Sequence, residues 1–248
     1  MFKIIKTDML KRYMIKFTIR LVIFITTFTV YITNKDLLFK AITYKVSLDI
    51  APLEFTLLQV LWLIFMVTMI LHLFPNDKLS MALRKGKKDT YVEVDNYSEY
   101  ELLKFVQDQN VKAWTVMLVW LSFNAIWGLL YLFEIIDSAD LLMLTVFYYL
   151  CDYICILFFC PFQTYIMKNK CCVNCRIYDW GHFMMFTPML FIKNFFSWSL
   201  FFTSLVVLIR WEIVYAKHPK RFYSGSNLTL QCQNCKDKTC QIKKQLRK

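Results

Sequence analysis

Turn-forming residues are scarce in this chain, and acidic residues are few. Its 248 residues include only 4 glycines and 5 prolines, and 18 acidic residues stand against 30 lysines and arginines. A soluble domain of this length carries more charge and more turn residues. The chain instead is 58% hydrophobic, with 23 phenylalanines among its residues. This composition predicts long apolar helices in a membrane.

Signatures of several enzyme classes are also lacking. The sequence contains no phosphate-binding loop, no dinucleotide-binding fingerprint, no serine–histidine–aspartate candidate and no metalloprotease helix. Its three histidines form no paired pattern across helices, which disfavours haem. No two-fold internal repeat of the kind common in transporters is present. The sequence therefore leaves open whether the protein is an enzyme.

Apolar runs long enough to cross a bilayer recur along the chain, since a spanning helix needs about 20 mostly apolar residues. They predict an all-α polytopic membrane helical bundle with four transmembrane helices and a fifth, long broken or re-entrant element. The expected spans are Met14 to Thr33, Pro52 to Phe74, Ala113 to Ile136, Leu141 to Met167 and His182 to Trp211, the last interrupted by Pro188, Lys193 and Asn194. The first span is expected to be retained, because no small-residue cleavage site follows it.

Polar segments separate these membrane portions. The expected order is a basic N-terminal segment (1–13), membrane portion 14–74, a cytosolic loop (75–112), membrane portion 113–167, a first cysteine segment (168–181), membrane element 182–211 and a basic tail with a second cysteine segment (212–248). In the cytosolic loop, Thr90 to Val94 alternates weakly like a strand. Ser98 and Glu101 form a capping box ahead of an apolar stripe. We expect a short amphipathic helix there, lying on the membrane surface.

The positions of lysine and arginine predict the orientation, because cytoplasmic loops carry an excess of these residues. The segment up to Arg20 has six, the 75–112 loop seven, the 137–140 turn none and the tail from Lys217 nine. These counts place both termini in the cytosol if residues 182–211 cross an even number of times. They outweigh the glycosylation sequon at Asn227, which implies a lumenal tail. The net charge of +12 then reflects this bias and attraction to anionic lipid, and no nucleic-acid partner is expected.

Six of the nine cysteines lie in two polar segments that share a pattern. Cys172 to Cys175 and Cys232 to Cys235 both read Cys-x-Asn-Cys, with a basic residue after each. Two thiolates three residues apart on a tight turn can bind one tetrahedral ion. Two such turns supply a four-thiolate set, typical of structural zinc and of mononuclear iron sites. A shared site needs both segments on one side of the membrane, which again requires an even number of crossings.

Several interpretations of these cysteines remain open. Structural zinc bound by Cys172, Cys175, Cys232 and Cys235 is the first prediction. An iron or iron–sulfur centre is the second, with Cys171 and Cys240 as additional ligands. A disulfide framework, which needs an oxidising compartment, and free thiols are the others. His182 or His218 could replace one of the cysteines as a ligand.

Asp152 lies in the middle of the fourth expected span, where a carboxylate is costly unless it faces protein or water. We expect it to be uncharged unless a cation pairs with it, with Asn124 or Lys193 as the candidate partner. Arg20, near the start of the first span, is expected to extend to the headgroups. A proton-relay or cation-binding role for Asp152 competes with simple packing. Cys151, Cys155 and Cys160 are expected to act as small apolar residues.

The sequence thus predicts an integral, multi-pass membrane protein in contact with the lipid bilayer, with unknown protein partners. Its first functional hypothesis is a binding or scaffold protein whose metal is structural. The alternatives are a membrane redox protein that uses iron, an iron–sulfur cluster or a dithiol, and a small transporter built around Asp152.

Overall fold

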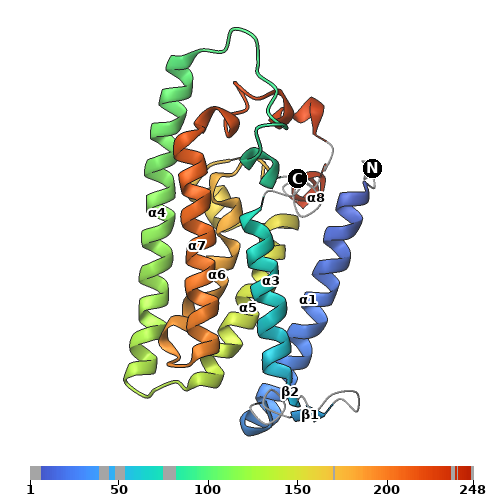
Figure 1. Cartoon of the computed structure of the whole chain (residues 1–248), viewed down its shortest axis with the longest axis vertical. Coiled ribbons are helices and arrows are strands. Elements are labelled where there is room, and N and C mark those ends of the chain that lie inside the picture. The colour runs from blue at the N-terminus through green and yellow to red at the C-terminus, as the bar shows by residue number, and fades with distance from the viewer. Residues whose placement is uncertain are drawn as a thin grey trace.

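The computed structural model describes residues 7–38, 45–47, 54–74, 82–169, 171–235, 238 and 240–246. Within these residues, four helices are long and apolar enough to span a bilayer: α1 (Asp8–Thr33), α4 (Glu99–Leu132), α5 (Ser138–Leu157) and α7 (Phe195–Lys217). The shorter apolar helix α3 (Leu57–Leu73) runs alongside them (Figure 1). The predicted class, a mainly helical chain with several potential membrane spans, is confirmed.

Each long helix begins at a residue whose side chain accepts a backbone N–H of the first turn. These N-caps are Thr7 for α1, Thr56 for α3, Ser98 for α4, Asp137 for α5 and Asn194 for α7. Such caps satisfy donors that the helix itself leaves unpaired, and each contributes about 1 kcal/mol. The starts of the helices are therefore encoded locally.

The helices pack in pairs. Helix α1 packs against α5 and α3 against α7, and the short helix α6 (Gly181–Phe186) lies between α5 and α7. Helix α4 contacts the non-α segments η2 (Phe162–Ile166), η3 (Arg176–Trp180), η4 (Thr187–Phe191) and η5 (Pro219–Arg221). The core is rich in aromatic side chains, among them Phe183, Phe186 and Trp211. Large apolar side chains of α1, α3 and α4 point outward, as suits helices in contact with lipid.

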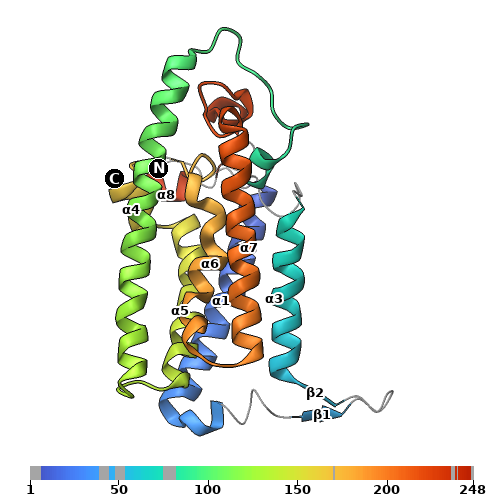
Figure 2. The ribbon, with the colours of Figure 1, turned by 60° about the vertical axis from the view of Figure 1, so that its left-hand side comes forward.

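The expected surface helix near Ser98 is not a separate element. Ser98 caps α4 itself, which continues without interruption to Leu132, four residues short of the expected end of the third span. No proline stands in the way of this continuation. At about 1.5 Å per residue, 34 residues extend about 51 Å, well beyond a hydrocarbon core of about 30 Å. The first turns of α4 therefore protrude past the end of α3 (Figures 1 and 2).

The expected fourth span is also divided. Helix α5 ends at Leu157, and the backbone N–H groups of Phe158 and Phe159 both bond to the carbonyl of Ile154. Pro161, which lacks an N–H, lies two residues after Phe159 and precedes the π-helical turn η2. Sequence hydropathy alone did not reveal this break.

The broken element beyond residue 181 runs along the bundle and returns. Helical structure is continuous from Arg176 to Phe191, the chain turns at residues 192–194, and α7 leads back beside α6 (Figure 2). A mixed α- and 3₁₀-helix of this length extends about 29 Å if straight, close to the hydrocarbon thickness. The turn coincides with the interruption at Lys193 and Asn194 in the sequence.

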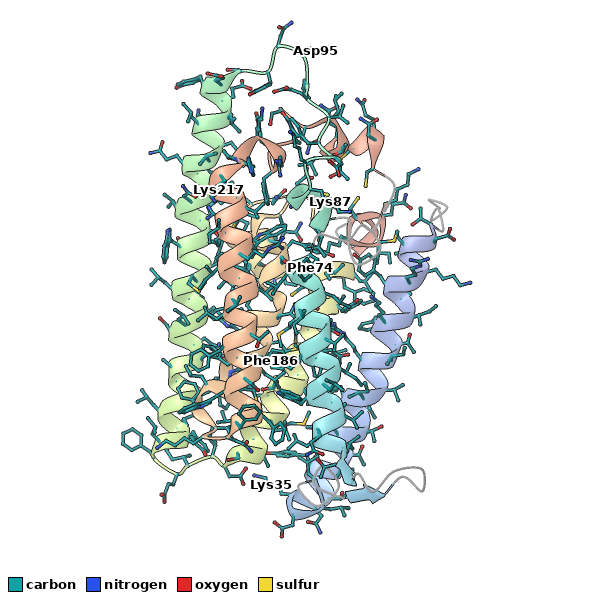
Figure 3. The ribbon with its side chains drawn as sticks, viewed as in Figure 1. Lys35, Phe74, Lys87, Asp95, Phe186 and Lys217 are labelled. Carbon is teal, nitrogen blue, oxygen red and sulfur yellow. The ribbon has the colours of Figure 1, made fainter. Side chains whose placement is uncertain are left out.

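As a result, the segments before α6 and after α7 lie at one end of the bundle. Lys87 and Lys217 mark this end in Figure 3, and Lys35 marks the opposite one. The start of α1 lies at the same end as helix α8 (Cys240–Leu246), and Leu10 and Tyr13 of α1 share an apolar cluster with Ile242.

Extended structure is limited in the described part of the chain. The strands β1 (Lys45–Ser47) and β2 (Glu54–Thr56) pair antiparallel. The weak strand pattern over Thr90 to Val94 corresponds to a single bridge, in which Glu93 pairs with Asn227 of the tail. Asn227 is buried, and its side-chain amide donates to the carbonyl of Arg221 at 2.9 Å. The sequon asparagine is thus inaccessible in this fold.

Candidate functional site

Asp152 pairs with a cation, but not with the expected one. Nη1 of Arg20 lies 2.8 Å from Oδ2 of Asp152 and donates to the carbonyl of Tyr149 at 2.6 Å. The guanidinium lies over the rings of Tyr149 and Tyr153, 3.9 and 4.0 Å from their centroids. Gly181 permits this site, because a Cβ there would lie 2.7 Å from Oδ1 of Asp152. The expectation that Arg20 extends to the headgroups is wrong, since a carboxylate and two aromatic faces hold it within the bundle.

The other suggested partners of Asp152 lie elsewhere. Asn124 donates to the carbonyl of Trp120 at 2.9 Å and accepts the hydroxyl of Tyr148 at 3.3 Å. Lys193 lies in the turn between η4 and α7. The candidate site at Asp152 is therefore a charge pair between α1 and α5.

A second cluster of polar side chains lies where α3 meets η3 and α6. Nδ1 of His72 lies 3.1 Å from Oδ1 of Asp179, and the rings of His72 and His182 lie 4.5 Å apart. Arg210 donates to the carbonyl of His72 at 3.4 Å. The adjoining cavity, about 10 Å³, has room for a water molecule at most. These residues are too far apart in the sequence for a local motif to have indicated them.

The two Cys-x-Asn-Cys segments do come together. In each, the N–H of the last cysteine bonds to the carbonyl of the first, Cys175 to Cys172 and Cys235 to Cys232. Both asparagines then donate to the same short turn, η6 (Leu228–Leu230): Asn174 to Leu230 at 3.2 Å and Asn234 to Leu228 at 2.9 Å. We call residues 82–94, 171–175 and 218–235, which meet at this end of the bundle, the cap.

The sulfurs of the two segments nevertheless diverge. Cys172 and Cys175 are buried, whereas Cys232 is exposed, and Cys171 and Cys235 share an apolar cluster with Val173 and Leu230. Burial raises the pKa of the Cys175 thiol to about 12, and the nearby Lys85 opposes this only in part. Among the residues that the structure describes, no three His, Cys, Asp or Glu side chains gather as a metal-binding group. The predicted four-thiolate set is not assembled among these residues, because Cys172 and Cys175 are buried whereas Cys232 is exposed.

The shared zinc site, like its iron and iron–sulfur alternatives, therefore stays a prediction of the sequence. If it forms, Cys175→Ser and Cys232→Ser should each remove the metal, and the double variant should lose little more. Elemental analysis of purified protein measures this. Metal that survives both single substitutions, or protein that contains none, contradicts a shared site.

Helix α8 inserts a lysine beneath the cap. The Lys243 ammonium donates to the carbonyl of Cys155, to Oε1 of Gln163 at 2.7 Å and to Sγ of Cys172 at 2.7 Å. Lys243 is only 3% exposed. A buried ammonium has three donors to satisfy, and here it has three acceptors. This contact fastens the tail to the end of α5 and brings a positive charge to a group of thiols.

Cys155 lies in the last turn of α5, and Cys160 lies just before η2. The N–H of Gln163 donates to Sγ of Cys160 at 3.4 Å. The neighbouring Cys155 thiol, the N–H donors of the turn that follows Cys160 and the charge of Lys243 lower the pKa of the Cys160 thiol below its usual value.

A groove of about 420 Å³ lies between α4 and α7. Apolar side chains such as Trp114, Met117 and Ile209 form most of its wall. Its polar part is formed by Arg176 and Glu212, which make an ion pair, and by Trp180, whose Nε1 donates to Oε1 of Glu212 at 2.9 Å. The sequence gives no sign of this groove, because the groove depends on how α4 and α7 pack against each other.

Arg176 is the unusual residue of the groove. Its side chain is 9% exposed, its Nη atoms donate to Asn110 and Glu212, and its face lies 4.0 Å from the centroid of the Tyr215 ring. Its Nε, however, finds no hydrogen-bond acceptor among the described residues. Buried N–H groups are rarely left unpaired, so this donor indicates a missing partner.

Comparison of the chain with family models, with curated proteins and with solved structures gave no match. The function is therefore argued from these sites alone.

Proposed function

We propose that this chain is an integral membrane binding protein whose groove between α4 and α7 holds one acyl chain of a glycerophospholipid. The lipid's ester or phosphate oxygens accept the free Nε–H of Arg176. The observation that carries the proposal is this buried, unpartnered donor at the polar part of an apolar groove.

The location of the groove supports a ligand that comes from the bilayer. Both walls belong to helices long and apolar enough to span it. A volume of about 420 Å³ lies in the lower part of the range of ligand pockets, roughly 300–1,000 Å³, and suits a single chain better than a whole diacyl lipid. Apolar walls with a few placed polar groups are typical of such pockets.

The charge of the polar part restricts the ligand further. Glu212 already offsets the charge of Arg176, so the ligand has to supply an acceptor oxygen but no additional full charge. Gln109 is buried and lies one helical turn before Ala113, which lines the groove. Its Oε1 lacks a hydrogen-bond donor among the described residues. A headgroup with both acceptors and donors fits these two unpaired atoms.

The orientation that we propose places this end of the bundle in the cytosol. The polar part of the groove lies close to Lys217, which ends α7 at the basic end (Figure 3). Lysine and arginine counts favour the cytosol for that end, with both termini there. The ligand then comes from the cytosolic leaflet.

Blocking the groove tests the proposal. Ala216 lines the groove and is exposed, so Ala216→Trp fills the space without entering the core. The protein is reconstituted with a phospholipid that carries a photoreactive group on its acyl chain, and crosslinked peptides are identified by mass spectrometry. We expect about tenfold less crosslinking to α4 and α7, the effect of about 1.4 kcal/mol in binding.

The matched control is Ala125→Trp, the same substitution at an exposed position of α4 outside the groove lining. It should crosslink like the unmodified protein. Equal crosslinking of groove peptides in both variants would show that the lipid contact is that of any membrane helix, and would refute the binding function.

A further inference from the structure

We propose that the first turns of α4 bind a second copy of this chain, so that the protein forms a two-fold dimer with its α4 helices parallel. The contact surface, which we call the stripe, consists of Tyr100, Leu103, Gln107 and Val111. None of these residues lines the groove between α4 and α7, so the inference goes beyond the proposed lipid binding.

One side of these turns is already occupied by the chain itself. The rings of Phe105 and Tyr223 lie 4.7 Å apart, and Gln109 is buried. At about 100° per residue, Gln107 lies on roughly the opposite side of the helix from Phe105 and Gln109. Successive residues of the stripe are three or four positions apart, so they form one row along this outer side.

The bilayer does not cover the start of the stripe. Tyr100, Leu103 and Val111 are 75%, 68% and 64% exposed. If the residues from Ala113 to Leu132 fill the hydrocarbon core, Tyr100 lies about 20 Å beyond its edge, at about 1.5 Å per residue. The headgroup layer on each side is only about 5–8 Å thick, so Tyr100 and Leu103 lie in water. Large apolar side chains exposed in a row there indicate a contact with protein.

The membrane determines how a second copy can bind. Two copies of a membrane protein insert with the same orientation, so a two-fold axis along the membrane normal makes their α4 helices parallel. Helix α4 forms one edge of the bundle, which leaves its outer side open to a neighbour (Figure 1). The stripe of one copy can therefore pack along the stripe of the other.

The charges beside the stripe are complementary in this parallel arrangement. Across a parallel helix pair, a residue that flanks the apolar row lies opposite the residue five positions later in the partner. Glu99 and Lys104 are five positions apart, flank the layer of Tyr100 and Leu103, and are exposed. Glu99 then faces Lys104 of the partner subunit, and the symmetry forms this contact twice.

The polar residue of the stripe also fits a second copy. Gln107 is exposed and, near the two-fold axis, lies opposite the partner's Gln107. Each side-chain amide has donors and an acceptor, so the two can bond to each other. A polar residue within an apolar row fixes the register of a helix pair at some cost in stability.

Charge reversal tests the contact in the full-length protein. Donor- and acceptor-labelled copies are reconstituted in liposomes, and energy transfer is measured over a range of protein-to-lipid ratios. Glu99→Lys and Lys104→Glu should each weaken self-association about tenfold, because each places like charges opposite one another twice. A mixture of the two variants pairs every acid with a base again and should associate like the unmodified protein. This recovery also shows that both variants are folded.

Leu103→Glu should weaken self-association at least about tenfold, because it places two carboxylates within the apolar row. The matched control is Val92→Glu, at an apolar position that is 48% exposed and lies outside the stripe. It should associate like the unmodified protein. The proposal is overturned if the unmodified protein stays monomeric at every ratio, which leaves the stripe to a different protein. It is equally overturned if Leu103→Glu associates as well as Val92→Glu, or if the mixed charge variants fail to associate.

Discussion

Replacing Arg20 by methionine is expected to destabilise the bundle by about 3–5 kcal/mol, because it leaves the Asp152 carboxylate without its cation inside the bundle. Asp152→Asn should cost a similar amount, since it strands the guanidinium of Arg20, which now has only a carbonyl and two rings as partners. The double variant should recover most of the loss, because an uncharged pair needs no compensation. Unfolding in mixed micelles, followed against the mole fraction of denaturing detergent, measures the coupling energy.

A second charge pair in the same protein provides the control. Lys35 and Asp137 lie 3.3 Å apart with side chains 43% and 55% exposed. The corresponding double-variant cycle should give a coupling below about 1 kcal/mol, as expected for an exposed pair. If the effects at Arg20 and Asp152 simply add, the two residues do not form the pair that the structure shows.

Replacing Lys85 by methionine should stabilise the cap at neutral pH. Lys85 is 2% exposed, and burial lowers its pKa from 10.5 to about 8, against the opposing effect of the neighbouring Cys175 thiol. Below pH 8 the ammonium is charged in both states, and its burial costs about 3 kcal/mol. Lys85→Met removes this cost and gives up one hydrogen bond, from Nζ to the carbonyl of Cys175 at 3.1 Å. A net gain of about 2 kcal/mol is therefore expected.

The stability gained by Lys85→Met should depend on pH. Between pH 8 and 10.5 the unfolded chain binds more protons at Lys85 than the folded one, so the stability of the unmodified cap rises with pH across this window. The advantage of Lys85→Met should shrink over the same window and vanish above it. Amide hydrogen exchange of residues 82–91 and 171–175, compared between the proteins at each pH, reports the opening of the cap. Lys88→Met, at an exposed position, should change nothing, and faster exchange in Lys85→Met at pH 7 would contradict the prediction.

Much of the fold follows from local features of the sequence. Apolar length indicated the long helices, and the capping box at Ser98 correctly marked a helix start. The interruption at Lys193 and Asn194 marked the turn before α7, since Asn194 both breaks the apolar run and caps the next helix. The ends of α4 and α5 were placed less well, because a helix continues past polar residues and stops at backbone constraints that hydropathy ignores.

The candidate sites depended on contacts between distant segments. Arg20 and Asp152 both stand out as charged residues in apolar runs, but nothing local shows that the helix faces that carry them meet. The repeated Cys-x-Asn-Cys pattern indicated two matching turns, and the turns indeed match. The pattern predicts that the sulfurs meet at one ion, whereas the hydrogen bonds that join the segments come from Asn174 and Asn234. Spacing identifies a local shape, but the direction of each side chain depends on what packs against it.

The clasp that Asn174 and Asn234 make on the turn Leu228–Leu230 has a consequence for biosynthesis. Residues 176–191 carry Arg176, Asp179 and His182 and are short for a spanning helix, so they insert poorly by themselves. If they cross the membrane, we expect them to enter it together with α7, as a hairpin. The clasp can close only after residue 234 has been synthesised. Until then these hydrogen bonds do not join the segment before α6 to the segment after α7, and a truncation before Asn234 removes one of the two contacts.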